Sequence, residues 1–177
     1  TGDLQPLVTA KDVILYIIGE IHADGANYKA VEFCGETVQG LDVASRMTLC
    51  NMAVEMGAKT GLVSPDQKTR SYLSGRVQSR GKMAQNDPDA DFEEIYNFEV
   101  QNLGPQIACP PYVDNVKPIE EVEGTHVDQV FLGSCTNGRL EDLRIAARLL
   151  KGKKIHGDVR MIVMPASREV YVNAVKE

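Results

Sequence analysis

The chain has 177 residues, of which 43% are hydrophobic and 25% charged, and its formal net charge is -6. This is the composition of an ordinary globular protein, and an acidic chain has no electrostatic basis for binding nucleic acid or an anionic membrane surface. No apolar run approaches the roughly 20 residues that cross a bilayer, so neither nucleic acid nor membrane is expected as a partner.

The first third of the chain alternates predicted helices with short strands. Residues 9–12 resemble a capping box and open a helix that reaches Ile21, with Gly25 as its stop. After it we expect a strand at 28–33, a helix at 42–56 ending at Gly57, a strand at 60–63 and a short helix after Asp66. Four residues at helical spacing are predicted to form the buried stripe of the second helix: Val43, Met47, Cys50 and Val54.

The middle of the chain, 74–118, carries weaker signals. Residues 86–89 read as a turn, 95–100 as a possible strand, and four prolines punctuate the rest. This stretch is therefore expected to contain a linker or domain boundary.

The last third has a clear pattern of alternating strands and helices. Buried strands are predicted at 130–132 and 159–164, and helices at 139–151 and from Arg168 onward, with Ser167 as N-cap. Such a β-α-β-α order predicts parallel strands, with the loops at 133–138 and 165–167 at the same sheet edge. A piece of about 50 residues has too little core to stand alone, so we expect this domain to be incomplete.

The chain contains four cysteines, and none of them belongs to a CxxC pair: Cys34, Cys50, Cys109 and Cys135. No secretory signal is visible, so we expect a cytoplasmic protein in which most thiols are reduced and buried. The first residue is Thr1 rather than Met, and the natural N-terminus is expected to lie upstream.

Cys135 departs from that default because of its surroundings, the string Gly-Ser-Cys-Thr-Asn-Gly-Arg at 133–139. It lies between a predicted strand and a helix N-terminus, where free N–H groups favour a thiolate, an anionic cluster or a carboxylate. Thr136 and Asn137 can hydrogen-bond sulfur or cap the helix. A buried thiol with Asn137 as N-cap fits the same residues, since one cysteine alone does not define a metal site.

The string at 133–139 resembles the cluster-ligand motif of the aconitase superfamily, and 138–144 is similar to its isopropylmalate dehydratase and homoaconitase branch. A second block, 46–60, also resembles that family, and shorter matches at 9–12, 115–118 and 123–125 follow in the family's order. The resemblance implies an α/β fold, with three-layer α/β/α aconitase-type domains and mostly parallel sheets. It places 1–114 in the second family domain and 115–177 at the start of the third.

The resemblance also implies roles for single residues. Cys135 would be one of three cysteines that bind a [4Fe-4S] cluster, the other two forming a CxxC pair that this chain lacks. Glu55 would contact the leaving water, Asn51 would hydrogen-bond near the cluster sulfurs, and Asn137 is predicted as a further cofactor-binding residue. By spacing alone, Thr48, Asn51 and Glu55 share a helix face that could equally be a solvated polar face.

The implied activity is that of an iron–sulfur hydro-lyase that isomerises 2- and 3-isopropylmalate by dehydration and rehydration, as in leucine biosynthesis. Its partners would be a small hydroxy-acid substrate and a small subunit that supplies the base. Homoaconitase or dimethylmaleate hydratase activity, or a catalytically incompetent isolated domain, are the alternatives. A cysteine nucleophile lacks a patterned histidine, and a nucleotide-binding module lacks both GxGxxG and a P-loop.

Overall fold

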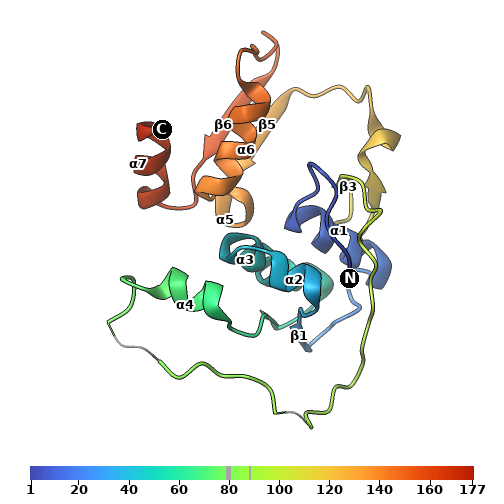
Figure 1. Ribbon diagram of the computed structural model, residues 1–177. Coiled ribbons are helices and arrows are strands. Elements are labelled where there is room, and N and C mark those ends of the chain that lie inside the picture. Colours follow the sequence, from blue (N-terminus) through green and yellow to red (C-terminus); the bar gives the residue numbers. More distant parts are fainter. Residues whose placement is uncertain (79–80, 88) are drawn as a thin grey trace. The chain divides into compact units, whose positions relative to one another are not determined.

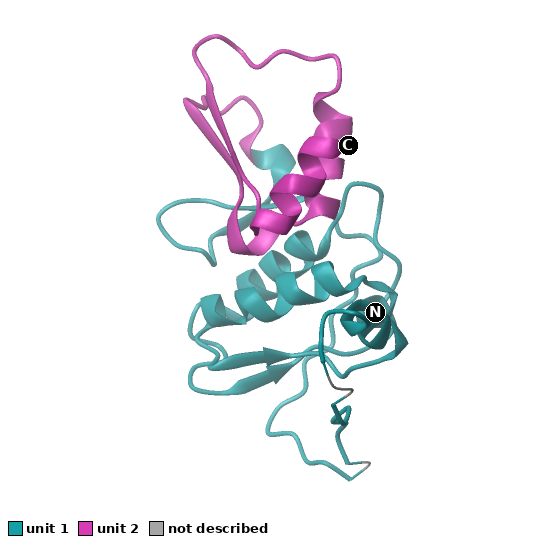
Figure 2. Ribbon diagram, turned by 90° about the vertical axis from the view of Figure 1, so that its left-hand side faces the viewer, with its two compact units in different colours: residues 1–121 teal, residues 122–177 magenta. Residues whose placement is uncertain are grey.

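The computed structural model describes residues 1–78, 81–87 and 89–177 (Figure 1). They form two compact units, 1–121 and 122–177 (Figure 2). The first unit reaches past residue 114 because the strands β3 (Gln106–Ala108) and β4 (Val116–Pro118) pair with each other in an antiparallel hairpin. The assignment of 1–114 and 115–177 to two family domains stays a prediction.

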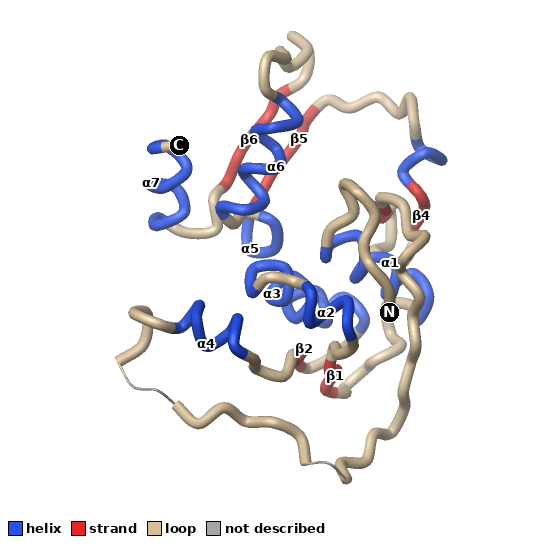
Figure 3. The backbone as a smooth tube through the Cα atoms, in the orientation of Figure 1, coloured by secondary structure: helices blue, strands red, loops and turns tan. Residues whose placement is uncertain are grey.

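The first unit consists of short helices around one pair of parallel strands (Figure 3). Besides the hairpin, its elements are α1 (Ala10–Ile21), β1 (Ala30–Glu32), α2 (Glu36–Gly40), α3 (Val43–Met52), the 3-10 turn η1 (Ala53–Met56), β2 (Thr60–Leu62) and α4 (Gln67–Leu73). A second 3-10 turn, η2 (Ile119–Val122), follows β4. No helix among the described residues is both long and apolar enough to cross a membrane.

The capping box predicted for α1 is confirmed. The backbone N–H of Thr9 donates to the Asp12 carboxylate at 2.7 Å, and the Thr9 hydroxyl accepts from the Lys11 N–H at 3.3 Å. Asp12 also accepts from the Gln106 N–H at 2.8 Å, which ties β3 to the start of the helix. At the other end α1 stops at Ile21, and a Cβ on Gly25 would lie 2.0 Å from the Ile21 oxygen, so only glycine fits against this terminus.

The core of the first unit lies between α1 and α3–η1. Its largest fully buried side chains are Ile14, Ile18, Leu49 and Met56. The predicted stripe of the second helix is wrong, because Val54 is 63% exposed while Leu49, Met52, Ala53 and Met56 face the core. The sequence contains two apolar stripes at helical spacing, and packing against α1 decides which of them is buried.

The strand predicted at 95–100 does not form. The Val100 N–H donates to the Thr1 oxygen at 2.9 Å, and the Thr1 amino group donates to the Phe98 oxygen. Two backbone hydrogen bonds to one residue are too few for a strand, so β-propensity alone was not sufficient here. The turn predicted at 86–89 includes Pro88, which lies outside the described residues.

A buried cation joins three helices of the first unit. The Arg46 guanidinium donates to the Val38 and Gln39 oxygens at the end of α2, at 3.2 and 3.0 Å. It also pairs with Asp66, the N-cap of α4, at 2.6 Å. The predicted start of α4 is thereby confirmed, and Arg46 fixes it against α2 and α3.

This ion pair predicts an acid-dependent contribution to stability. Hydrogen bonds from Arg46 and from the Thr69 backbone hold the pKa of Asp66 well below its usual 3.8. A depressed carboxyl pKa stabilises the fold above the unfolded value, and the contribution is lost as the pH falls through the folded value. Asp66→Asn should therefore flatten the fall in thermal stability below about pH 4. Asp42→Asn is the control, since Asp42 caps α3 through Ser45 at 2.7 Å; equal flattening by both variants contradicts the prediction.

The second unit has the predicted β-α-β-α order. Its elements are β5 (Gln129–Gly133), α5 (Ser134–Asn137), α6 (Leu140–Leu150), β6 (Arg160–Met164) and α7 (Arg168–Lys176). The two strands are parallel, with Gln129 opposite Arg160 and Gly133 opposite Met164. Ser167 is the N-cap of α7, as expected, and accepts from the Val170 N–H at 3.2 Å.

Two expectations for this unit are wrong. Residues 134–137 form a short helical turn rather than a loop. The strands are not buried, since Phe131 is 53% and Val163 48% exposed, and no apolar side chain within 122–177 belongs to the buried set. The helices α5, α6 and α7 are too few to cover both faces of the two-stranded parallel sheet, which agrees with the expectation that this piece holds too little core.

Candidate functional site

Cys135 lies in α5, directly after β5, and its side chain is exposed. Gly133 and Ser134 before it both have positive φ, 113° and 82°. A Cβ on Gly133 would lie 2.1 Å from the Met164 oxygen, so the close approach of β6 requires glycine there. The chain thus turns sharply at the end of the strand and presents the thiol at the sheet edge.

The loops after β5 and β6 lie side by side, as predicted. The Ala166 N–H donates to the Gly138 oxygen at 2.7 Å. Gly138 is buried, and a Cβ there would lie 2.4 Å from the Ser134 oxygen and 2.8 Å from the Met164 oxygen. The backbone of the second loop therefore holds the far end of the cysteine turn.

This close fit predicts that Gly138→Ala distorts the cysteine turn. The added methyl group must push apart two backbone carbonyl groups, and overpacking of this kind destabilises a fold by about 1–3 kcal/mol. The measurement is the shift of the thermal unfolding midpoint. Gly152→Ala is a poor match because Gly152 has positive φ, whereas Gly157→Ala adds its methyl group in open space and should leave the midpoint unchanged. Equal midpoints for Gly138→Ala and Gly157→Ala would show that the turn is not tightly held.

The cysteine turn has its own polar contacts. The Cys135 sulfur lies 3.7 Å from the Thr136 hydroxyl. Asn137 does not cap α6, because the N-cap position is taken by Arg139. Instead the Asn137 amide donates to the Asp142 carboxylate at 3.0 Å, and Asp142 also accepts from the Arg139 N–H at 3.0 Å. Sequence reasoning missed Asp142, although an acidic residue at the third helical position is a recognisable capping signal.

Asn51 and Glu55 lie on α3 and η1 of the first unit, and both are exposed. Thr48 does not share their exposed surface, since it is 2% exposed and donates to the Ala44 oxygen at 3.4 Å. Glu55 therefore lies one turn beyond Asn51 on an exposed surface. Both a site residue and a residue of a solvated polar face would be placed in this way.

The turn that carries Glu55 is held firmly. Met56 next to it is fully buried, and the Met56 oxygen accepts from the Ala26 N–H at 2.9 Å. The Gly57 oxygen accepts from the Tyr28 N–H at 3.1 Å, and Gly57 has the left-handed φ of 84° expected of a C-cap. Glu55 is thus exposed next to a backbone segment that two hydrogen bonds hold on its C-terminal side.

Within the units, the structure brings Cys135 together with Asn137, and Asn51 together with Glu55. Among the described residues, no group of three or more His, Cys, Asp or Glu side chains could hold a metal ion. Of the other cysteines, Cys34 is exposed, while Cys50 and Cys109 are partly buried, and burial raises the pKa of the Cys50 thiol. Cys135 can therefore supply one thiolate, and the described part of the chain does not complete a ligand set around it.

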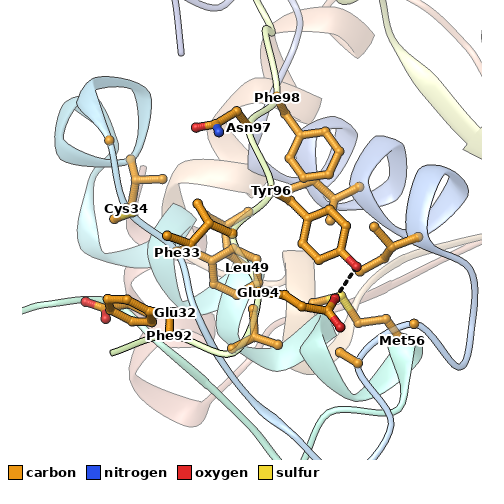
Figure 4. Close-up of a pocket in the computed structure, with 18 of the residues that line it drawn as sticks. Glu32, Phe33, Cys34, Leu49, Met56, Phe92, Glu94, Tyr96, Asn97 and Phe98 are labelled. Carbon is orange, nitrogen blue, oxygen red and sulfur yellow. Dashed lines mark hydrogen bonds between the residues drawn. The ribbon is translucent and has the colours of Figure 1, made fainter. Parts of the chain in front are cut away.

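A cavity of about 540 Å³ lies in the first unit, between α1, β1 and residues 92–98 (Figure 4). Leu49 and Met56 line it from the core side, and Tyr96 and Phe98 from the 92–98 segment, where Tyr96 donates to Glu94. None of the four predicted site residues lines this cavity. Because the largely apolar wall of this cavity is continuous with the core, the cavity does not identify a catalytic site.

Comparison with known proteins identifies the fold family. Residues 1–124 and 113–177 match the model of the Aconitase family (aconitate hydratase), and together these matches cover the chain. The chain belongs to the aconitase family. The α/β class with parallel strand pairs is accordingly that of an aconitase-type domain, as the sequence predicted.

Curated relatives of this aconitase-family chain carry two kinds of name. A probable 3-isopropylmalate dehydratase large subunit from Methanothermobacter thermautotrophicus is 57% identical over 99% of the chain. A 3-isopropylmalate dehydratase large subunit from Methanopyrus kandleri is 54% identical, and a probable methanogen homoaconitase large subunit from M. thermautotrophicus 52%, each over 100% of the chain. The chain spans 41–42% of the length of these relatives.

Proposed function

We propose that this chain is part of the large subunit of a hydro-lyase that isomerises 2-isopropylmalate and 3-isopropylmalate by dehydration and rehydration. The observation that carries the proposal is the exposed Cys135 on a rigid turn at the end of β5, within the aconitase-family motif at 133–139. The names of relatives at 54% and 57% identity support the substrate. Leucine biosynthesis in the cytoplasm is the corresponding cellular setting.

The cofactor that fits this reading is a [4Fe-4S] cluster. Cys135 supplies a soft thiolate ligand at an exposed turn, which is the donor type that iron–sulfur clusters require. Two more thiolates must come from outside this chain, and an isolated fragment would be catalytically incompetent. When bound, a cluster with an open iron site supplies a Lewis acid that makes hydroxide a better leaving group.

The residues of this chain would then do three things. Glu55, exposed on its fixed turn, holds and transfers a proton at the oxygen of the leaving water. Asn51, one turn earlier on α3, donates an amide N–H toward the cluster sulfurs. Asn137 keeps one N–H on Asp142, which leaves its second N–H for the cofactor.

The partner in this proposal is the small subunit, as the large-subunit names of the relatives suggest. It would supply the base that removes the proton from the neighbouring carbon. The substrate is a small hydroxy acid.

Homoaconitase activity is the second candidate, favoured by relatives of that name at 52% and 55% identity. The test is an assay of the complete large subunit, reconstituted with iron, sulfide and its small subunit, on isopropylmalate and on homocitrate. Turnover of isopropylmalate alone supports the first reading and turnover of homocitrate alone the second. A reconstituted enzyme that dehydrates neither would contradict both.

A further inference from the structure

Asp142 stands at the third position of α6 and accepts two hydrogen bonds from different parts of the preceding turn. One carboxylate oxygen accepts from the Asn137 side-chain amide and the other from the Arg139 backbone N–H, each at 3.0 Å. All three residues are partly buried. The end of α5 and the beginning of α6 are therefore joined through a single carboxylate.

This carboxylate also decides how the Asn137 carboxamide is oriented. A carboxylate only accepts hydrogen bonds, so the NH₂ group of Asn137 must face Asp142 and its oxygen must face away. The negative charge is in a favourable place, because it lies at the N-terminus of an eleven-residue helix. The orientation of Asn137, two residues after Cys135, is thus set by a residue outside the family's cysteine string.

We propose that Asp142 is a positioning residue for the cluster-ligand turn: it fixes the Asn137 carboxamide and, through it, the turn that carries Cys135. This inference rests on the proposed function, since the ligand held at Cys135 is the cluster. Residues that orient metal ligands through such hydrogen bonds typically change metal affinity about 10- to 100-fold when they are replaced.

Asp142→Asn tests the inference because it turns an acceptor into a donor. If the new amide oxygen still accepts from the Arg139 N–H, the NH₂ group of the new side chain faces the NH₂ group of Asn137. The carboxamide of Asn137 must then rotate.

The experiment uses the complete large subunit with its small subunit, reconstituted with iron and sulfide. Asp142→Asn should lose iron to a chelator roughly 10- to 100-fold faster than the parent. Its fully loaded cluster should show a shifted Fe–S(Cys) stretching band in resonance Raman spectra, which a loss of global stability alone would not produce. Glu141→Gln, which removes a neighbouring exposed carboxylate of α6, should behave like the parent.

Asp142→Glu keeps the carboxylate and the helix cap but places the carboxylate oxygens one methylene further out. This variant therefore tests the inference if Asp142→Asn fails to fold. It should fold like the parent and still lose iron faster. Parent-like retention and an unshifted Raman band in Asp142→Glu, or in a folded Asp142→Asn, would overturn the inference and leave the proposed function intact. A parent protein that assembles no cluster would overturn both.

Discussion

Replacing Cys135 by alanine is expected to abolish both turnover and the visible absorbance of the cluster in the complete, reconstituted enzyme. The proposed function assigns this thiol as a cluster ligand, and a cluster deprived of one of three thiolates loses its attachment at that iron. Cys135 is exposed on a helical turn, so the smaller side chain leaves no cavity and folding should be preserved. Absorbance, iron content and dehydratase rate are the three measurements.

Cys34→Ala is the matched control, because Cys34 is also exposed and also follows a strand of a parallel pair, β1. It should keep the cluster and full activity. A Cys135→Ala enzyme that retains both iron and activity contradicts the cluster assignment. An active variant that contains no iron at all contradicts the proposed chemistry as well, because the reaction would then proceed without a Lewis acid.

The elements that could be predicted from the sequence are those with local signals at their ends. Thr9 and Asp12 specify the start of α1, Asp66 that of α4 and Ser167 that of α7, each through a side chain that accepts a backbone N–H. Capping of this kind depends on a few adjacent residues, so it can be read without tertiary information. The parallel pairing of β5 with β6 followed from chirality and connection length, which are also local properties.

The errors concern features that depend on distant partners. The choice between Val54 and Met56 as a core residue depends on α1, some forty residues earlier. The exposure of Phe131 depends on whether further layers cover the sheet, which a strand's own residues do not reveal. A strand at 95–100 needed more than the two backbone hydrogen bonds that Thr1 makes.

The candidate site shows the same division. The family string located Cys135, and the glycines beside it explain why the turn accepts no larger residues. The hydrogen bonds of Asp142 were not predicted, because its partner Asn137 was interpreted as bonding sulfur or as capping the helix itself, and not as a donor to the third residue of that helix. Roles for Asn51 and Glu55 came from resemblance, and the structure adds that their turn is exposed and rigidly held.

Glu55 provides the second large expected effect, since its carboxylate is proposed to handle the leaving water. Glu55→Gln keeps the size of the side chain and its exposure, and the buried neighbours Ala53 and Met56 continue to hold the turn. The amide neither accepts nor releases a proton in the working pH range, so the variant removes proton transfer without removing the contact. Cluster content and thermal stability should therefore equal those of the parent, and kcat should fall by roughly 10²- to 10⁴-fold.

The control for this prediction is Glu20→Gln, which neutralises another exposed helical carboxylate on α1 and should leave kcat unchanged. The effect of Glu55→Gln should appear mainly in kcat, because the interaction it removes is needed as the hydroxyl departs and adds little to binding of the intact substrate. A rise in KM with unchanged kcat would assign Glu55 to substrate binding instead. Parent-like values of both constants would place Glu55 outside the site, on a solvated face of α3 and η1.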